Sequence, residues 1–231
     1  MKKNIGQNIV KHKIRFDLEI IASIIRNNSK VLDIGCGDGE LLQYLNINNN
    51  SDARGIELSS SLVSQCLAKG LSVIQGDAEN DLSYYPDNSF DYAILSHTIQ
   101  ATHRPDQIIE EMLRVANCAI ISMPNFAHIN NRLHLLVNGT MPVNETIPFQ
   151  WYETPNIHFC SINDFKNLCR KLNLNIKREI FLTEKKIIRS KLYANLFARY
   201  AIFVVVKNEL GANYEFEFAN KALANPKRLL V

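Results

Sequence analysis

The chain has 231 residues and a formal net charge of +3, with 46% hydrophobic and 21% charged residues. This composition is typical of a globular domain, and so small a net charge does not favour a nucleic-acid partner. No apolar run approaches the roughly 20 residues of a membrane span. Lys2 and Lys3 are not followed by the apolar segment of a signal peptide, so we expect none. We therefore expect a single cytoplasmic α/β domain that binds neither membrane nor nucleic acid.

In chain order, residues 1–15 show no clear periodicity and are expected to form a loose arm. A domain is expected over residues 16–206, and it begins with a helix that carries Leu18, Ile21 and Ile24 on one side. Residues 207–231 also lack periodicity, which predicts a disordered tail.

A buried strand and a glycine-rich turn follow at residues 30–40. Val31, Leu32 and Ile34 form a short apolar run, and it is broken at once by three alternate glycines, Gly35, Gly37 and Gly39. Glycine permits positive φ and lets a ligand approach the backbone closely. Leucines then resume at helical spacing, so the pattern predicts a nucleotide-binding strand, loop and helix.

The spacing is D-x-G-x-G-x-G, which differs from the G-x-G-x-x-G of dinucleotide-binding folds. Asp33 at the end of the strand would repel a pyrophosphate but would favour a ligand with ammonium and sulfonium charges. S-adenosylmethionine (SAM) is such a ligand. The pattern resembles the first motif of class I SAM-dependent methyltransferases.

Two further acids stand at the ends of the next predicted strands. Glu57 closes a strand at 53–58 and follows Gly39 by 18 residues, near the roughly 20-residue offset of acids that bind ribose hydroxyls. Asp77 follows a strand at 71–75, where the resembling superfamily binds the adenine amino group. Each acid could instead be a capping or turn residue, but their common position at strand ends favours one site.

The alternation of strands and helices continues to residue 124. Strands are expected at 90–95 and 118–123, with a helix from Pro105 between them. Residues 125–160 break the pattern with three prolines and Trp151, which predicts an insertion beside the site that could act as a lid. Trp151, Tyr152 and Phe159 could floor an acceptor pocket, face a partner or form the insertion's own small core.

Order returns after the insertion. The spacing predicts a helix over 162–172, a strand over 176–182, a core-facing amphipathic helix through Ile188, Leu192 and Leu196, and a last strand over 200–206. Successive strand and helix units indicate an α/β fold with a mostly parallel sheet. The class I methyltransferase resemblance implies a Rossmann-like, seven-stranded sheet with one antiparallel strand and an insertion after strand 5.

The cysteines and histidines give no metal or disulfide pattern. The five cysteines are scattered without a C-x-x-C, and no histidine lies in a metal-ligand spacing. We expect no metal and reduced, mostly buried thiols. Cys36 lies inside the glycine loop, but packing is the better interpretation than reactivity. A histidine could act as a base on an acceptor, although a structural role is the better interpretation.

Several segments resemble one family within that superfamily, the methionine biosynthesis protein MetW. They are residues 17–21, 32–42, 86–92 and, most specifically, 150–160, which read Gln-Trp-Tyr-Glu-Thr-Pro-Asn-Ile-His-Phe-Cys. The resemblance implies a role in methionine biosynthesis beside a homoserine O-acyltransferase. It implies no known methyl acceptor, and no catalytic residue can be assigned.

We expect SAM or S-adenosylhomocysteine to bind with its methionine part at the glycine loop, its ribose at Glu57 and its adenine at Asp77 and the Ala78 amide. The candidate cofactor-binding residues are Asp33, Gly35, Cys36, Gly37, Gly39, Glu57, Leu58, Asp77, Ala78 and Ser96. Two functions stay open, because methyl transfer relies on proximity and needs no signature motif. One is an accessory subunit of the acyltransferase, and the other is a methyltransferase acting on an unidentified small molecule.

Overall fold

The structure, a computed structural model, describes residues 14–208. The expected arm at 1–15 lies almost wholly outside the described residues, and the expected tail lies outside them from residue 209. In chain order the elements are α1 (Phe16–Ile24), β1 (Lys30–Ile34), α2 (Glu40–Asn48), β2 (Asp52–Glu57), α3 (Ser60–Ala68), β3 (Ser72–Gln75), α4 (Ala78–Asp81), η1 (Leu82–Tyr84), β4 (Phe90–Ser96), η2 (Ile99–Ala101), α5 (Pro105–Val115), β5 (Ala116–Pro124), α6 (Ile129–Asn138), α7 (Ile162–Lys171), β6 (Leu174–Leu182), β7 (Ile187–Ile188), α8 (Ala194–Phe197) and β8 (Tyr200–Lys207).

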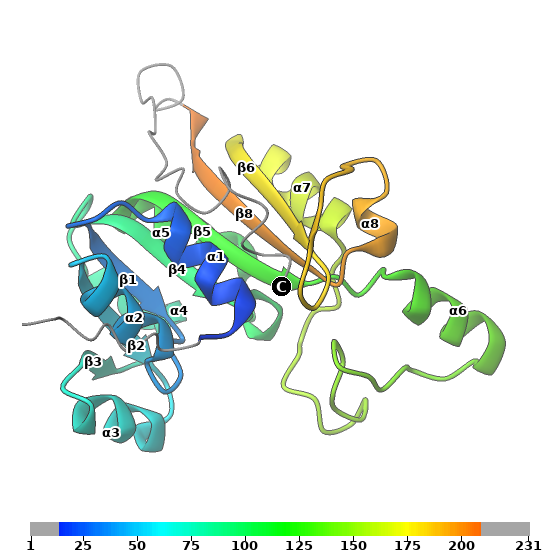
Figure 1. The fold of residues 1–231 in the computed structure, drawn as a ribbon, viewed down its shortest axis with the longest axis horizontal. Coiled ribbons are helices and arrows are strands. Elements are labelled where there is room, and N and C mark those ends of the chain that lie inside the picture. The colour runs from blue at the N-terminus through cyan, green and yellow to red at the C-terminus, as the bar shows by residue number, and fades with distance from the viewer. Residues whose placement is uncertain (1–13, 209–231) are drawn as a thin grey trace, which may run out of the picture.

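The strands form one sheet in the order β3-β2-β1-β4-β5-β8-β6-β7 (Figure 1). Neighbours from β3 to β5 are parallel, whereas β8 runs antiparallel to both β5 and β6. The expected α/β fold with one antiparallel strand among seven long strands is confirmed. The strand number differs, because the two-residue β7 pairs with the end of β6 as an eighth strand.

Helices cover both faces of this sheet. Helices α1, α2 and α3 pack on one face, and α5, α7 and α8 pack on the other, so the molecule has two hydrophobic cores. Val31 contributes to the first core and its neighbour Leu32 to the second. Burial on both faces explains why the strands are apolar runs without polar alternation.

The strand order reverses direction at β1. From β1 the chain builds outward through β2 to β3, and it then returns to add β4 and β5 on the other side. Open α/β sheets bind ligands at such a switch point, in the crevice beyond the carboxyl ends of the strands. The glycine turn after β1 and the turn after β4 both lie at that edge.

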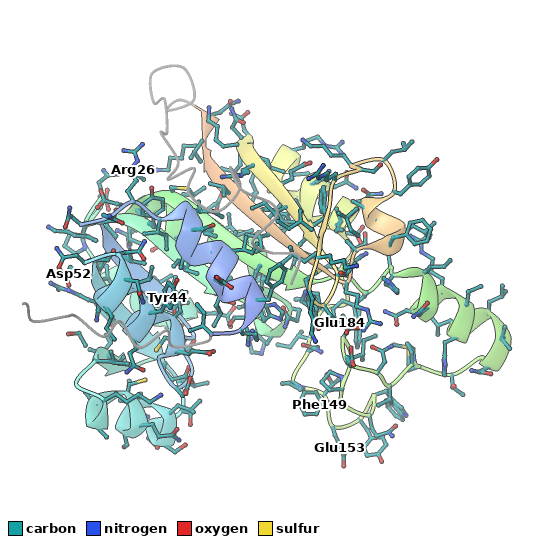
Figure 2. All side chains as sticks on the ribbon, viewed as in Figure 1. Arg26, Tyr44, Asp52, Phe149, Glu153 and Glu184 are labelled. Atoms are coloured by element: carbon teal, nitrogen blue, oxygen red, sulfur yellow. The ribbon has the colours of Figure 1, made fainter. Side chains whose placement is uncertain are left out.

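The insertion over 125–160 projects from the sheet and contains a helix, α6, that the sequence did not lead us to expect (Figure 1). Phe149 and Glu153 mark its outer part in Figure 2. At its base, the Phe126 amide donates a hydrogen bond to the Cys160 carbonyl at 3.2 Å, so the two ends of the insertion are joined.

The expected amphipathic helix through Ile188, Leu192 and Leu196 is wrong. Ile188 belongs to β7 and pairs with Phe181, and Leu192 is 82% exposed. Only the four-residue α8 is helical there. Because the backbone of β7 is committed to the sheet edge, it cannot join a helix, and the regular spacing of the three side chains is not an amphipathic face.

Asn125 anchors the insertion to the domain, and its substitution tests that anchor. Its buried side chain donates to the carbonyls of Asn195 and Ala198 at 3.0 and 2.8 Å. Asn125→Ala leaves both acceptors unpaired, so we expect the free energy of unfolding to fall by about 2–4 kcal/mol in urea titrations. The matched variant Asn130→Ala alters an exposed helix position and should change it by less than about 0.5 kcal/mol. Equal effects would contradict the anchor.

Candidate functional site

The turn after β1 is held against the end of β2 by its backbone. The amides of Gly35 and Cys36 both donate to the Ile56 carbonyl, at 2.8 and 3.3 Å, and the Gly37 amide donates to Glu57 Oε2 at 2.9 Å. Gly35 and Gly37 have φ of +68° and +59°. This turn therefore requires glycine at both positions, because residues with a side chain rarely adopt the left-handed backbone conformation.

The three glycines meet different surroundings. A β-carbon at Gly35 would lie 2.9 Å from Thr98 Oγ1, so this glycine allows the turns after β1 and β4 to touch. A β-carbon at Gly39 would collide with Leu71, which lets α2 begin close to β3. At Gly37 no atom of the described chain lies within 4 Å of that position. The middle of the turn therefore presents an open backbone face.

The Glu57 carboxylate holds this turn in place through a hydrogen bond. Its Oε2 accepts from Gly37 and its Oε1 accepts from the Ser59 amide at 2.9 Å. Each carboxylate oxygen has a second lone pair, so hydroxyl donors of a ligand could still bind. The sequence predicted an acid near the turn, but not that it organises the turn itself.

Asp33 is the most unusual group at this edge. Its side chain is buried, and Oδ1 has no hydrogen-bond partner within the described chain. Burial raises the pKa of Asp33 to about 7, the nearby Glu57 charge adds to the rise, and Arg15 opposes it. A buried acceptor without a donor is costly, and a ligand that brings a donor or a positive charge would relieve that cost.

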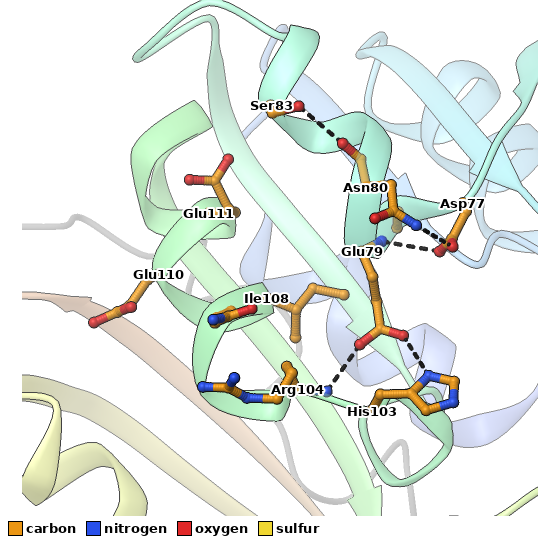
Figure 3. Close-up of a pocket in the computed structure, with 11 residues that line it drawn as sticks. Asp77, Glu79, Asn80, Ser83, His103, Arg104, Ile108, Glu110 and Glu111 are labelled. Carbon is orange, nitrogen blue, oxygen red and sulfur yellow. Dashed lines mark hydrogen bonds and ion pairs between the residues drawn. The ribbon is translucent and has the colours of Figure 1, made fainter.

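Asp77 has a structural role that the sequence left open. It is the N-cap of α4: Oδ1 accepts from the Glu79 amide at 3.0 Å, and Oδ2 accepts from Asn80 Nδ2 at 2.7 Å. Asp77 and Ala78 also line one end of a cavity of about 620 Å³ between α4 and α5 (Figure 3). On its rim, Glu79 lies 2.9 Å from His103 Nδ1. Their assignment to adenine stays a prediction.

The remaining candidates lie around the turn. Cys36 is buried, and burial raises the pKa of its thiol above the usual range, with the Asp33 charge adding to the rise. The thiol is therefore protonated and suited to packing. Leu58 is 68% exposed. Ser96, at the end of β4, has its Oγ 3.1 Å from Ser122 Oγ.

Sequence reasoning missed a polar cluster beside Ser96. Arg15 donates to both oxygens of Asp17 at 2.7 and 2.9 Å, and to Ser96 Oγ at 3.4 Å. His97 Nε2 lies 3.2 Å from Asp17 Oδ2. Burial alone would raise the pKa of Asp17, but bonding to His97 and Arg15 outweighs it and holds this pKa well below its usual range. An acid in the first turn of a helix is common, so Asp17 gave no signal in the sequence.

Residues 14–208 contain neither a membrane-spanning helix nor a metal-binding cluster. No helix there is long and apolar enough to cross a bilayer. No group of three or more histidine, cysteine, aspartate or glutamate side chains is arranged there to hold a metal ion. All five cysteines are free, and four of them are buried.

A family comparison decides the relationship. The model of the family described as methionine biosynthesis protein MetW matches residues 15–205. The chain belongs to the MetW family. A relative in Rhodopirellula baltica, the bifunctional methionine biosynthesis protein MetXA/MetW, is 35% identical over 177 residues, which are 73% of this chain and 28% of that protein.

Other similarities extend beyond MetW. Ajmaline N-methyltransferase of Rauvolfia serpentina is 26% identical over 157 residues. The chain spans only 28% of the length of the MetXA/MetW relative and 52% of the length of the ajmaline enzyme. A SAM-dependent methyltransferase from Archaeoglobus fulgidus has a TM-score of 0.60 at 18% identity, covering 84% of this chain and 91% of its own. The plantazolicin methyltransferase BamL, solved with a triazolic substrate analog and SAH, has a TM-score of 0.60 at 16% identity, covering 84% and 83%. Together these structures confirm that this member of the MetW family has a class I methyltransferase fold.

The buried Asp33 carboxyl predicts an unusual pH dependence of stability. The folded chain keeps this proton up to about pH 7, whereas the unfolded chain releases it near the ordinary value of 3.8. Unfolding therefore releases a proton within this window, and Asp33 makes the protein less stable as the pH rises through it. We expect the stability of Asp33→Asn relative to wild type to grow by up to about 4 kcal/mol between pH 4 and pH 8. Urea titrations across that range measure the difference, and a constant difference would contradict the protonated state.

Proposed function

We propose that this MetW protein binds SAM or S-adenosylhomocysteine at the carboxyl ends of β1, β2 and β3, and that it acts in methionine biosynthesis together with a homoserine O-acyltransferase. One observation carries the cofactor assignment: the unpartnered Oδ1 of buried Asp33 beside the open face of Gly37. A ligand with ammonium and sulfonium charges would match this carboxyl, and a pyrophosphate would not.

The residues present fit that ligand. Asp33 and the turn from Gly35 to Gly39, with Cys36, would hold the methionine part, Glu57 and Leu58 the ribose, and Asp77 with Ala78 the adenine. Glu57 already fixes the turn through the Gly37 amide at 2.9 Å. Ribose binding at its other lone pairs would therefore make the turn and the ligand mutually supporting. When bound, SAM supplies a methyl group on a positively charged sulfur.

A pair of glycine variants separates ligand approach from backbone strain. Gly37 and Gly70 both have left-handed φ and open space where a β-carbon would stand, but Gly70 lies at the end of α3, away from the turn. Each alanine variant should lose roughly 1–2 kcal/mol of stability. Only Gly37→Ala should also lose SAM affinity, by about tenfold or more in calorimetry, because its methyl group enters the ligand's approach. No SAM binding by wild type, or equal affinity in both variants, would overturn the cofactor site.

The insertion supports the partnership with an acyltransferase. Large apolar side chains stand exposed across it, and we name them the insertion surface: Leu136, Val137, Phe149, Trp151, Tyr152 and Ile157. Trp151 and Tyr152 are 71% and 66% exposed, with ring centroids 5.6 Å apart in an edge-to-face pair. These two rings are not part of a small core, whereas Phe159 packs edge-on against Phe126. An exposed apolar surface of this kind favours a protein partner.

The bifunctional relative supports a particular partner. Its name joins MetXA and MetW in one protein, and this chain matches 28% of it. Joining two modules in one chain keeps them at high effective concentration, which favours modules that work in contact. A homoserine O-acyltransferase is therefore the partner we assign to the insertion surface.

The insertion is also connected to the candidate site. The amides of Ile157 and His158 both donate to the Gln100 carbonyl, at 2.8 and 2.9 Å, and Gln100 lies in η2 directly after the β4 turn. A partner on the insertion surface would thus bind a segment that is hydrogen-bonded to the edge of the cofactor crevice. This supports cofactor binding and partner binding as parts of one function.

The partner is tested with two aromatic variants and a matched control. Trp151→Ala and Tyr152→Ala should weaken the complex with homoserine O-acyltransferase by about thirtyfold each, because truncating an interface aromatic costs about 2 kcal/mol or more. Tyr84 is 84% exposed on η1, outside the insertion, so Tyr84→Ala should bind as wild type does. Affinity measurements and melting curves on all three variants give the comparison.

Two outcomes would count against this partner. Undetectable binding by wild type would remove the acyltransferase, and light scattering would then show whether a second copy of the chain covers the insertion surface. Full affinity in both insertion variants, with normal melting, would place the interface elsewhere.

A further inference from the structure

A second candidate site lies beside the glycine turn, around His97. Its imidazole Nε2 is 3.2 Å from Asp17 Oδ2, and its ring lies 5.0 Å from the ring of Tyr200. Asp17 in turn accepts hydrogen bonds from Nε and Nη2 of the Arg15 guanidinium. Residues at the start of α1 and at the start of β8 thus meet the imidazole that follows β4.

The backbone of His97 is itself unusual. Its φ is +54°, in the left-handed region, which is uncommon for residues other than glycine although asparagine, aspartate and histidine adopt it more often than the rest. Its amide donates to the Ser122 carbonyl at 3.0 Å, and its carbonyl accepts from Gln100 Nε2 at 2.6 Å. Conformations of this kind persist where surrounding bonds enforce them, and they cluster at functional sites.

His97 opens onto a cavity of about 270 Å³. Its lining also includes Phe16, Leu182, Thr183, Glu184 and Tyr200. This volume is just below the roughly 300–1,000 Å³ of most ligand pockets, which limits the cavity to a molecule of few atoms. The cavity adjoins the candidate cofactor site, because Arg15 in its wall donates to Ser96 at the end of β4, and Thr98 touches the turn at Gly35.

The charged side chains that line this cavity all lie in ion pairs. Asp17 is paired with Arg15, and Glu184 lies 2.8 Å from Arg199, which also lies 2.6 Å from Glu145. Phe16, Leu182 and the Tyr200 ring supply apolar surface. This combination suits a small, neutral molecule rather than an ion.

The Asp17 carboxylate beside its imidazole makes His97 a candidate base. Nε2 lies 3.2 Å from the Asp17 carboxylate, and a neutral ring that carries its proton at Nε2 leaves Nδ1 as an acceptor. Nδ1 has no hydrogen-bond partner within residues 14–208, and the side chain is 25% exposed. The buried carboxylate also stabilises the imidazolium that would form when Nδ1 takes a proton.

We propose that this cavity binds a small neutral alcohol or thiol as methyl acceptor and that His97, oriented by Asp17, takes its proton. A bond forms between the acceptor's oxygen or sulfur and the methyl carbon, while the bond from that carbon to the sulfonium sulfur breaks and its electron pair stays on that sulfur. The acceptor's proton passes to His97 Nδ1. This activity rests on the SAM site proposed above.

The first test is binding, read without turnover. Either 2-mercaptoethanol or ethylene glycol is added to wild-type protein that already holds S-adenosylhomocysteine. The imidazole NMR signals of His97 are then followed. They are assigned by their absence from His97→Gly. Either probe should shift the His97 signals and leave those of His134, on α6, in place. The two probes share one hydroxyl and differ in the other group, so signals that shift with 2-mercaptoethanol alone indicate recognition of the thiol.

The second test is chemical rescue. Glycine adopts the left-handed φ of position 97 and leaves the space of the ring empty. His97→Gly should bind SAM as wild type does, lose at least about 100-fold in kcat for methylating the effective probe, and recover when imidazole is added. Asp17→Asn should lower kcat without changing KM for the probe. His134→Gln is the matched control. If His97→Gly does not fold, His97→Asn replaces it in this test, because asparagine also tolerates this φ.

The outcomes separate the two proposals. Wild type that does not bind SAM contradicts the proposed function. Wild type that binds SAM but neither shifts its His97 signals nor methylates either probe contradicts this inference alone. Loss of activity in His97→Gly without rescue by imidazole assigns His97 a structural role, which also overturns the inference.

Discussion

The hydrogen bonds between the turn after β1 and the end of β2 are the constraint on which the candidate site depends. Two amides of the turn share the Ile56 carbonyl, and a third is held by the Glu57 carboxylate. These bonds need the left-handed backbone that glycine supplies. They fix the turn at the edge where strand order reverses, and the space at the β-carbon position of Gly37 is open.

Asp33 shows what this arrangement costs. A carboxyl buried without a full set of partners destabilises the folded chain when it ionises, and the nearby charge of Glu57 increases that cost. Stability is commonly sacrificed where a site must recognise a ligand. The acid that weakens the free protein is thus the group that a cationic ligand would neutralise, and binding and stability are linked through one proton.

The insertion and the β4 turn extend this site in two directions. Through Ile157 and His158, the insertion is hydrogen-bonded to Gln100, whose side chain donates to the His97 carbonyl. A protein partner on the exposed aromatics and a small molecule at His97 would therefore act on neighbouring parts of the same turn. The fold offers one route by which the two functional alternatives, an accessory subunit and a methyltransferase, could coexist.

The sequence by itself determined the strand, turn and helix of residues 30–48, the positions of Asp33 and Glu57 at strand ends, and the family. These features are local, because apolar runs and glycine spacing report nearest-neighbour backbone geometry. The role of Asp77 as a cap, the exposure of Trp151 and the strand at Ile188 depended on what each segment packs against. Only the tertiary structure brought Arg15, Asp17, His97 and Tyr200 together. The end of β4 and the start of β8 flank β5 in the sheet, and the start of α1 packs against them. These segments are far apart in the chain, and no sequence periodicity reports their contact.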